Sequence, residues 1–274
     1  MATFTYLGKQ VYYTVDGAGA PMVLLNGIMM STRSWEPFVP ALSANHQLIR
    51  VDLLDQGQTD KAAADIPYTQ MTQADLIIAL LDHLELPKAH LVGISYGGEV
   101  AIQLAIAYPQ RVDRLGLFNT TAYTTTWLAH IGHSWNAVGR TRDGAAYYKT
   151  TIPVIYSQQF YERRLDWMMA RQTKLEPIFS NPIFLDAIER LTNSAEHYDE
   201  RERLDRITAR TLIVAAEDDI LTPKGDQALL HQYIRSSELI SIPHCGHASM
   251  YEKPLLFTTL IIGFLTVAAT DYVI

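Results

Sequence analysis

The chain has 274 residues, of which 48% are hydrophobic and 19% are charged, and its formal net charge is −7. An apolar fraction of this size supplies a large buried core, which excludes intrinsic disorder, and the length fits one α/β domain with an insertion. The acidic balance argues against nucleic-acid partners, whose phosphates require a concentrated positive surface.

Targeting signals and cysteine usage indicate the cellular setting. Residues 1–9 lack a basic start followed by an apolar run, so we expect no secretory signal. The single cysteine, Cys245, excludes an intramolecular disulfide and a cysteine-based metal cluster, and it favours a reducing, cytoplasmic location. The most apolar stretch, residues 255–269, is shorter than the ~20 residues of a membrane span. We therefore expect a packed C-terminal helix and no stable membrane insertion.

Short apolar runs alternate with helical spacing along the chain. Residues 4–15 carry β-branched and aromatic side chains around a Gly-Lys-Gln turn and predict a hairpin. Further runs have the length of buried strands, at residues 22–25, 48–52, 89–93, 115–118, 211–215 and 239–242. Between them, residues 76–84 and 100–107 show the apolar spacing of helices. This alternation predicts an α/β fold, with a mostly parallel sheet and helices on both faces.

The alternation stops in residues 121–206, which have helical patterning, many aromatic side chains and no convincing strand. Such a segment between two strands predicts a helical cap inserted into a core made of residues 1–120 and 207–274. We expect three of its aromatic residues, Trp127, Trp135 and Trp167, to line the substrate pocket and to influence substrate choice.

The sequence Gly93-Ile-Ser95-Tyr-Gly97 lies directly after a predicted strand and directly before a predicted helix. A serine on such a tight turn presents its hydroxyl at the end of the sheet, and the glycines permit the close approach of strand and helix. The helix N-terminus favours developing negative charge. Ser95 is therefore the predicted nucleophile. The alternative is a glycine-rich turn in which the serine only caps the helix.

A serine hydroxyl requires a base that removes its proton during attack. Among nine histidines, His247 is preferred because it lies in the loop after the last predicted strand, at residues 243–247. His244, in the same loop, is the alternative. The histidines of the predicted cap, which we consider as possible substrate contacts, are His130, His133 and His197.

A carboxylate should accept a hydrogen bond from the other imidazole nitrogen, and it would stabilise the imidazolium formed on attack. The run Glu217-Asp218-Asp219 follows the predicted strand at residues 211–215. Chemistry alone does not choose between these three acids.

Acyl transfer also needs backbone donors for the tetrahedral oxyanion. One is expected from the amide of Tyr96, next to the nucleophile, and the other from the amide of Ile28 in the loop after the strand at residues 22–25. In that loop Gly27 permits the tight turn, and we expect Asn26, Gly27 and Met29 to border the substrate.

These motifs resemble the α/β-hydrolase superfamily, in its large branch of capped esterases, lipases, lactonases and C–C bond hydrolases. The family's late acid motif, Gly-x-x-Asp followed four residues later by Pro, corresponds to Asp219 and Pro223, so the resemblance selects Asp219. The family's Gly-His motif before Glu-x-Pro corresponds to Gly246-His247 before Glu252. The expected order of serine, acid and histidine is also present.

Two loops depart from the family pattern. Where relatives often have His-Gly before the oxyanion loop, this chain has Asn26-Gly27. Where they often have Asp-x-x-Gly-His-Gly, it has Asp52-Leu-Leu-Asp55-Gln56-Gly57. The resemblance therefore implies the catalytic residues but not the substrate.

The leading hypothesis is a carboxylesterase-like serine hydrolase that acts on a small-molecule ester, lactone or thioester through an acyl-enzyme on Ser95. A C–C bond hydrolase would use the same residues with cationic side chains for substrate carboxylates, for which Arg140, Arg163, Arg164 and Arg171 are available. An acyltransferase would use the same residues but exclude water from the acyl-enzyme. A non-catalytic receptor of this fold would bind a ligand without turning it over. A dehalogenase is disfavoured, because its nucleophile would be aspartate. We expect no cofactor and no metal, and the sequence does not indicate an oligomeric state.

Overall fold

The computed structural model describes residues 2–62 and 68–268 and contains an eight-stranded sheet in the order β1-β2-β4-β3-β5-β6-β7-β8. Its strands are β1 (Ala2–Tyr6), β2 (Lys9–Asp16), β3 (Ala20–Leu25), β4 (His46–Val51), β5 (Ala89–Ile94), β6 (Val112–Phe118), β7 (Arg210–Ala216) and β8 (Ser237–Ile242). The pairs β1/β2 and β2/β4 are antiparallel, and all other neighbouring strands run parallel. The predicted hairpin and the mostly parallel α/β sheet are confirmed.

Alternate residues of the central strands face two separate apolar clusters. In β3, Val23 and Leu25 belong to the cluster on one face of the sheet, whereas Met22 and Leu24 belong to the cluster on the other. Every residue of β5 is buried. A strand covered on both faces reads as a continuous apolar run, which explains why these strands were visible in the sequence.

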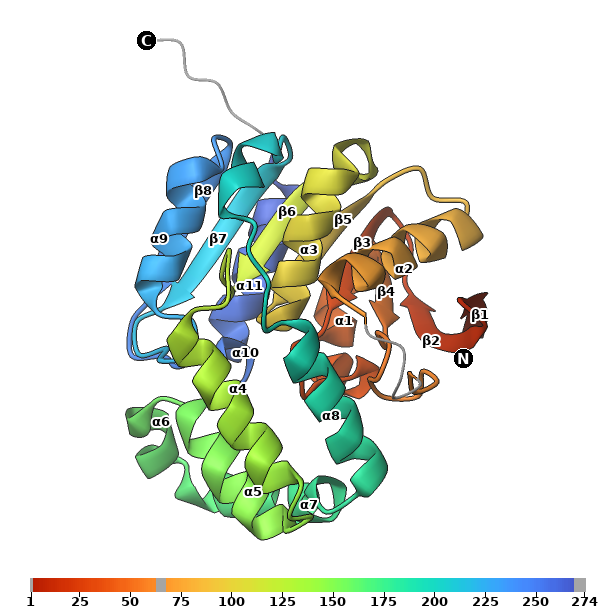
Figure 1. Ribbon diagram of the computed structural model, residues 1–274. Coiled ribbons are helices and arrows are strands. Elements are labelled where there is room, and N and C mark those ends of the chain that lie inside the picture. Colours follow the sequence, from red (N-terminus) through yellow and green to blue (C-terminus); the bar gives the residue numbers. More distant parts are fainter. Residues whose placement is uncertain (1, 63–67, 269–274) are drawn as a thin grey trace.

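Helices cover both faces of the sheet, as Figure 1 shows. One cluster includes residues of α2 (Gln70–His83), α3 (Tyr96–Ala107) and α9 (Lys224–Tyr233). The other includes residues of η1 (Thr32–Phe38), α1 (Val39–Leu42), α10 (Ser249–Glu252) and α11 (Pro254–Thr266). The expected C-terminal helix is α11, although residue 269 at the end of that expectation lies outside the described residues.

Between β6 and β7 the chain forms a group of helices beyond one end of the sheet, seen in the lower part of Figure 1. They are α4 (Thr126–Gly139), α5 (Gly144–Thr151), η3 (Ile152–Val154), α6 (Gln158–Arg163), α7 (Leu165–Phe179) and α8 (Pro182–Ser194). We call residues 126–194 the helical insertion. After it, the chain passes through η4 (Arg201–Arg206), and η2 (Pro109–Arg111) precedes β6.

The two chain segments that enter and leave the helical insertion are held together at its base. Tyr123 and Asp199 form an isolated antiparallel bridge. Beside it, the Thr124 amide donates to the Tyr198 carbonyl at 2.9 Å, and the Glu200 amide donates to the Ala122 carbonyl at 2.8 Å. These backbone hydrogen bonds bring the start and the end of the helical insertion to the same side of the core.

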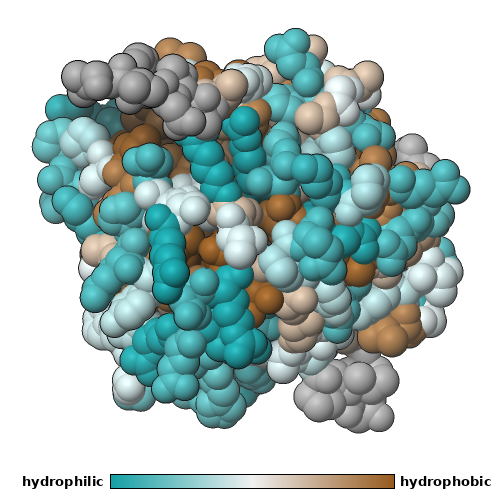
Figure 2. Space-filling model, turned by 90° about the horizontal axis from the view of Figure 1, so that it is seen from above, coloured by the Kyte–Doolittle hydropathy of each residue, from teal (hydrophilic) through white to brown (hydrophobic). Residues whose placement is uncertain are grey.

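The face at the opposite end of the sheet is shown in Figure 2, where hydrophilic residues surround scattered hydrophobic ones. Single exposed apolar side chains of this kind are normal on protein surfaces. Among the described residues, no helix has both the length and the apolar character that crossing a membrane requires.

Candidate active site

Ser95 occupies a strained turn between β5 and α3. Its backbone lies in the positive-φ region, with φ 54° and ψ −125°, which non-glycine residues rarely adopt. A side chain at Gly93 would collide with the Gly97 backbone, and one at Gly97 would collide with the Leu25 carbonyl. The Ser95 amide donates to the Phe118 carbonyl at 3.0 Å, which fixes the turn to the neighbouring strand. The two glycines thus permit the close packing that holds this serine at the sheet edge.

His247 and Asp219 form a buried pair at the same edge. The His247 Nδ1 atom lies 2.8 Å from Asp219 Oδ2, and the two residues follow β8 and β7 respectively. Asp219 Oδ1 also accepts hydrogen bonds from the amides of Leu221 and Thr222 at 2.9 and 3.0 Å. Burial raises the pKa of Asp219, but His247 and these donors outweigh burial, so its pKa lies below its usual value. The carboxylate is therefore held in its charged form beside the imidazole.

Asn119, Thr222 and Ser249 complete the surroundings of Asp219, and sequence reasoning missed all three. Asn119 Nδ2 and Thr222 Oγ1 donate to Asp219 Oδ2 at 3.0 and 2.9 Å. The Ser249 hydroxyl donates to Asn119 Oδ1 at 2.6 Å and orients that amide. Asn119 is the first residue after β6, so its position at a strand end was the available signal. With these donors, the orientation of the carboxylate is fixed before any substrate binds.

The alternative acids and the alternative histidine lie elsewhere. Glu217 and Asp218 are exposed, whereas only 4% of Asp219 is exposed. Glu217 accepts a hydrogen bond from the backbone amide of His244 at 3.3 Å, and His244 is itself exposed. The structure therefore brings Asp219 and His247 together and leaves the alternatives at the surface.

The loop after β3 presents a backbone amide beside Ser95. Ile28 and Ser95 border the same cavity, and Tyr96 is the first residue of α3, where helix amides have no intrahelical acceptor. Within the described ranges, no group accepts a hydrogen bond from the amide of Ile28 or of Tyr96. Gly27 uses its own amide to donate to the Met30 sulfur at 3.3 Å. Two amides without an acceptor, one in a loop that lines the cavity of Ser95 and one directly after Ser95 in the chain, are suited to hold an oxyanion.

Gln56 fixes the orientation of the Gly27–Ile28 peptide. Its Nε2 donates to the Gly27 carbonyl at 2.9 Å, and the Met30 amide donates to the same oxygen at 3.1 Å. This peptide is trans, so its C=O and N–H groups point in opposite directions. Holding the Gly27 carbonyl therefore also fixes the direction of the Ile28 N–H. The side chain that replaces the family's common histidine therefore sets the direction of a candidate oxyanion donor.

The expectation that Asn26 borders the substrate is corrected. Asn26 is fully buried behind the loop, where its Nδ2 donates to the Val51 carbonyl at 2.8 Å and to Gln56 Oε1 at 3.0 Å. Its Oδ1 accepts from the Trp35 indole at 2.7 Å. A buried amide requires hydrogen-bond partners, and these three partners turn it away from the cavity. Asn26 instead supports Gln56.

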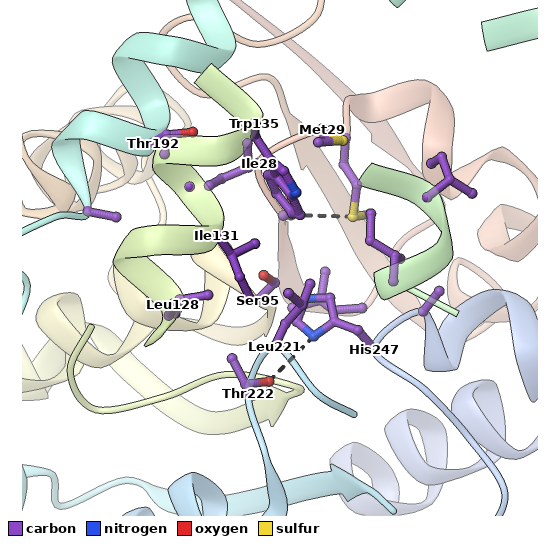
Figure 3. Close-up of a pocket in the computed structure, with 18 of the residues that line it drawn as sticks. Ile28, Met29, Ser95, Leu128, Ile131, Trp135, Thr192, Leu221, Thr222 and His247 are labelled. Atoms are coloured by element: carbon purple, nitrogen blue, oxygen red, sulfur yellow. Dashed lines mark hydrogen bonds between the residues drawn. The ribbon is translucent and has the colours of Figure 1, made fainter. Parts of the chain in front are cut away.

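The cavity lies between the sheet edge and the helical insertion, and its volume is about 170 Å³. Figure 3 shows Ser95 and His247 facing it, and Ile28 and Met29 also line it. Its apolar lining from the helical insertion includes Leu128, Ile131, Trp135, Ile152, Ile155 and Leu175. The core thus contributes the polar reacting groups and part of the apolar wall, and the helical insertion contributes a further part of that wall.

Only one of the three predicted tryptophans borders the cavity. Trp135 lines it. Trp127 is 60% exposed and donates from its indole nitrogen to the Ile220 carbonyl at 3.2 Å. Trp167 packs behind the wall against Tyr156 and Tyr251. The expected pocket roles of Trp127 and Trp167 are therefore corrected, since neither reaches the cavity surface.

A few polar groups from the helical insertion also border the cavity. Arg171 does so, whereas Arg163 and Arg164 are exposed on other surfaces. Of the histidines considered above, His133 reaches the cavity lining, where its Nε2 lies 3.0 Å from Glu196.

Among the residues that the structure describes, no three His, Cys, Asp or Glu side chains converge as a metal site.

The sheet, the strained serine turn and the buried acid–histidine pair define a class of protein. The sequence matches the alpha/beta hydrolase fold family over residues 20–254, so the chain belongs to this family. Its structure is also similar to that of MGS-M2, an alpha/beta hydrolase enzyme from a Medee basin deep-sea metagenome library. That similarity has a TM-score of 0.97 and 47% identity, and it covers 100% of both chains.

Similar curated proteins carry hydrolase names. A protein of Azorhizobium caulinodans named putative carbamate hydrolase RutD is 27% identical over 256 residues, covering 93% of this chain and 94% of its own. The pimeloyl-[acyl-carrier protein] methyl ester esterase of Nitrosomonas europaea is 27% identical over 259 residues, covering 91% and 97%. The chain is therefore a hydrolase of the alpha/beta hydrolase family.

Proposed function

We propose that this protein is a serine hydrolase that cleaves a carboxylic ester, lactone or thioester through an acyl-enzyme on Ser95. The observation that supports this most is that Ser95 and His247 border one cavity while His247 is paired with buried Asp219. This arrangement supplies a nucleophile, a base and an orienting carboxylate at the same sheet edge. We also propose that residues 121–206 act as a cap on a core of residues 1–120 and 207–274.

In the first half-reaction, the Ser95 hydroxyl attacks the ester carbonyl carbon while His247 Nε2 takes the hydroxyl proton. The bond between Ser95 Oγ and the carbonyl carbon forms, and the carbonyl π electrons move to the oxygen. The amides of Ile28 and Tyr96 donate to that oxyanion. When the tetrahedral intermediate collapses, the bond to the leaving alcohol breaks and the alcohol receives the proton from His247.

The second half-reaction repeats these steps with water. His247 takes a proton from water as the water oxygen attacks the acyl carbon, and Ser95 leaves with that proton when the second tetrahedral intermediate collapses. Asp219 stabilises the His247 imidazolium in both half-reactions. Its carboxylate is held in the charged form and lies 2.8 Å from His247 Nδ1. The products are a carboxylic acid and an alcohol.

The names of the relatives are compatible with this chemistry. A methyl ester and a carbamate both present a carbonyl carbon bonded to a leaving heteroatom, so the same serine, histidine and oxyanion donors serve both. The small, largely apolar cavity favours a small-molecule substrate over a polymer.

The experiment that tests the proposal is labelling with a fluorophosphonate, followed by peptide mass spectrometry. The adduct should map to Ser95, and Ser95→Ala should neither be labelled nor turn over p-nitrophenyl acetate above about 10⁻⁴ of the wild-type rate. Ser34→Ala is the matched control, because Ser34 also borders the cavity. Labelling of Ser34 in place of Ser95, or retention of a few per cent of activity by Ser95→Ala, would overturn the proposal.

A further inference from the structure

Arg171 places a positive charge in the wall of the cavity. It lies on α7 and borders the same cavity as Ser95. Its guanidinium carbon is 4.7 Å from the ring centre of Tyr251, 5.1 Å from that of Trp167 and 6.0 Å from that of Tyr156. These aromatic residues, from the helical insertion and from α10, hold the guanidinium against the otherwise apolar wall.

No protein group neutralises this charge in the part of the chain that the structure describes. Arg171 forms no salt bridge there and donates no hydrogen bond, and its Nε atom is buried without an acceptor. Arg140, in contrast, pairs with Glu189, and Arg190 pairs with Asp55. Arg171 is therefore a cation with unused donors at a binding surface.

The acidic residues around the cavity are engaged with other partners. Glu252 accepts hydrogen bonds from the Ser157 amide and hydroxyl at 2.7 and 2.6 Å and from the Gly246 amide at 3.1 Å. Glu196 pairs with His133. Neither forms a salt bridge with Arg171 within the described ranges, so the positive charge of Arg171 is available to an anionic ligand.

A stacked arginine is suited to bind a carboxylate. Aromatic rings interact favourably with the face of a guanidinium, and this leaves its in-plane N–H groups to donate in parallel to two carboxylate oxygens. A charge removed from water is unfavourable unless it is paired, so an anionic ligand gains more from this position than a neutral one. Because Ser95 borders the same cavity, a single bound molecule can contact both groups.

We propose that the substrate is an anionic ester, with a free carboxylate that Arg171 binds and an ester carbonyl that faces Ser95. This inference rests on the proposed function of Ser95 and adds the substrate class. The carboxylate belongs to the acyl part, as in a half-ester of a dicarboxylic acid, or to the alcohol part. Arg171 thereby selects the substrate, whereas Asp219, His247 and Ser95 perform the reaction.

The test compares matched charged and neutral esters. For the acyl part, the monomethyl esters of adipate, pimelate and suberate are compared with the methyl esters of hexanoate, heptanoate and octanoate. For the alcohol part, 4-acetoxybutanoate is compared with butyl acetate. We expect the wild-type kcat/KM to favour the charged member of at least one pair by about 10- to 100-fold.

Variants then assign this preference to one side chain. Arg171→Leu should lose the preference, measured as the ratio of kcat/KM between the charged and the neutral member of each pair, and Arg171→Lys should keep part of it, since a lysine retains charge without the planar fork. Arg163→Leu is the matched control, because Arg163 is exposed and does not border the cavity. If Arg171→Leu fails to fold, two measurements decide the same question: the preference of Arg171→Lys, and competitive inhibition of the wild type by adipate compared with its uncharged diamide, adipamide.

The outcomes separate this inference from the proposed function. If wild type hydrolyses p-nitrophenyl acetate but shows no preference in any pair and no stronger inhibition by adipate, the Arg171 inference is wrong and the serine hydrolase stands. A preference that survives in Arg171→Leu also overturns it. If wild type hydrolyses none of these esters and Ser95 is not labelled, the proposed function fails first.

Discussion

The sheet edge and the helical insertion meet at one cavity, but they hold their polar groups in different ways. At the sheet edge, Asp219 accepts hydrogen bonds from Asn119, Leu221 and Thr222, and it is almost completely buried. In the helical insertion, Arg171 has aromatic neighbours and, among the described residues, no carboxylate partner.

This difference indicates a division of roles. Groups that take part in bond making require a fixed orientation, and dense hydrogen bonding supplies it. A group that recognises a ligand keeps its donors available until the ligand binds. We therefore expect substitutions at the sheet edge to reduce turnover of every ester, and substitutions in the cavity wall to change which ester is preferred.

An ion pair with a buried carboxylate joins the helical insertion to the core. Arg190 on α8 donates from Nε and Nη2 to the two oxygens of Asp55 at 2.9 and 2.6 Å, and the Asp55 side chain is fully buried. Asp55 has a φ of 68°, at a position where the family pattern has glycine. The Tyr68 hydroxyl donates to the same carboxylate at 2.7 Å. Here the helical insertion is bound to the core through Asp55, the residue that directly precedes Gln56.

The largest effect is expected from Asp219→Asn, which should lower kcat by about 10⁴-fold on charged and neutral esters alike. The substitution removes the charge that stabilises the His247 imidazolium. Asp218→Asn is the control, since Asp218 is exposed, and it should remain within about twofold of wild type. Steady-state rates on p-nitrophenyl acetate check both variants. If Asp218→Asn loses activity and Asp219→Asn keeps it, the assignment of Asp219 as the acid that orients His247 is wrong.

The next effect concerns stability. Arg190→Met should lower the free energy of unfolding by about 3–5 kcal/mol, because it leaves the buried Asp55 carboxylate without its cation. Asp55→Gly combined with Arg190→Met should recover most of this loss, since glycine tolerates the positive φ and carries no charge. Urea unfolding measures both. A single Arg190→Met variant within 1 kcal/mol of wild type would show that the ion pair is dispensable.

A smaller effect on rate is expected at Gln56. Gln56→Leu removes one of the two donors to the Gly27 carbonyl and should lower kcat by about 10- to 100-fold with little change in KM. Affinity for a trifluoromethyl ketone, which forms a tetrahedral adduct with serine, should fall with kcat, while affinity for a product carboxylate should not. Gln58→Leu is the control, because Gln58 is exposed in the same loop. Equal losses of both affinities would indicate general loop disruption.

The smallest effect separates two tryptophans of the helical insertion. Trp135→Ala enlarges the cavity and should change the ratio of rates on butanoate and octanoate esters by about 3- to 10-fold. This is the size of effect expected when the contacts of about one methylene group are gained or lost in an apolar pocket. Trp127→Ala should leave this ratio unchanged, because Trp127 lies outside the cavity. Parallel p-nitrophenyl ester series measure the ratios. A shift caused by Trp127→Ala would place the selective wall elsewhere.

The sheet and the position of Ser95 could be predicted from sequence because their signals are local. Buried strands read as apolar runs, and the turn around Ser95 needs glycines at fixed positions on both sides. The family resemblance added Asp219, where the residues alone left three acids open. Each of these inferences depends on a few consecutive residues at a strand end.

The surroundings of the site could not be predicted in the same way. In α4, Leu128, Ile131 and Trp135 share the face that borders the cavity, and Trp127 precedes Leu128 by one position, which turns it ~100° around the helix. Aromatic content alone does not state which face of a cap helix turns inward. Contacts such as Ser249 with Asn119 join residues far apart in sequence, so only the fold brings them together.

The central claim is that Ser95 forms a covalent acyl intermediate, and rapid mixing with a p-nitrophenyl ester tests it most directly. Wild type should release a burst of p-nitrophenol close to one equivalent per active site, and acid-quenched protein should carry the acyl mass on the peptide containing Ser95. Asp219→Asn should form the same adduct more slowly, and Ser95→Ala should show none. Steady ester turnover without any acyl adduct on Ser95, or with the adduct on another residue, would contradict the account.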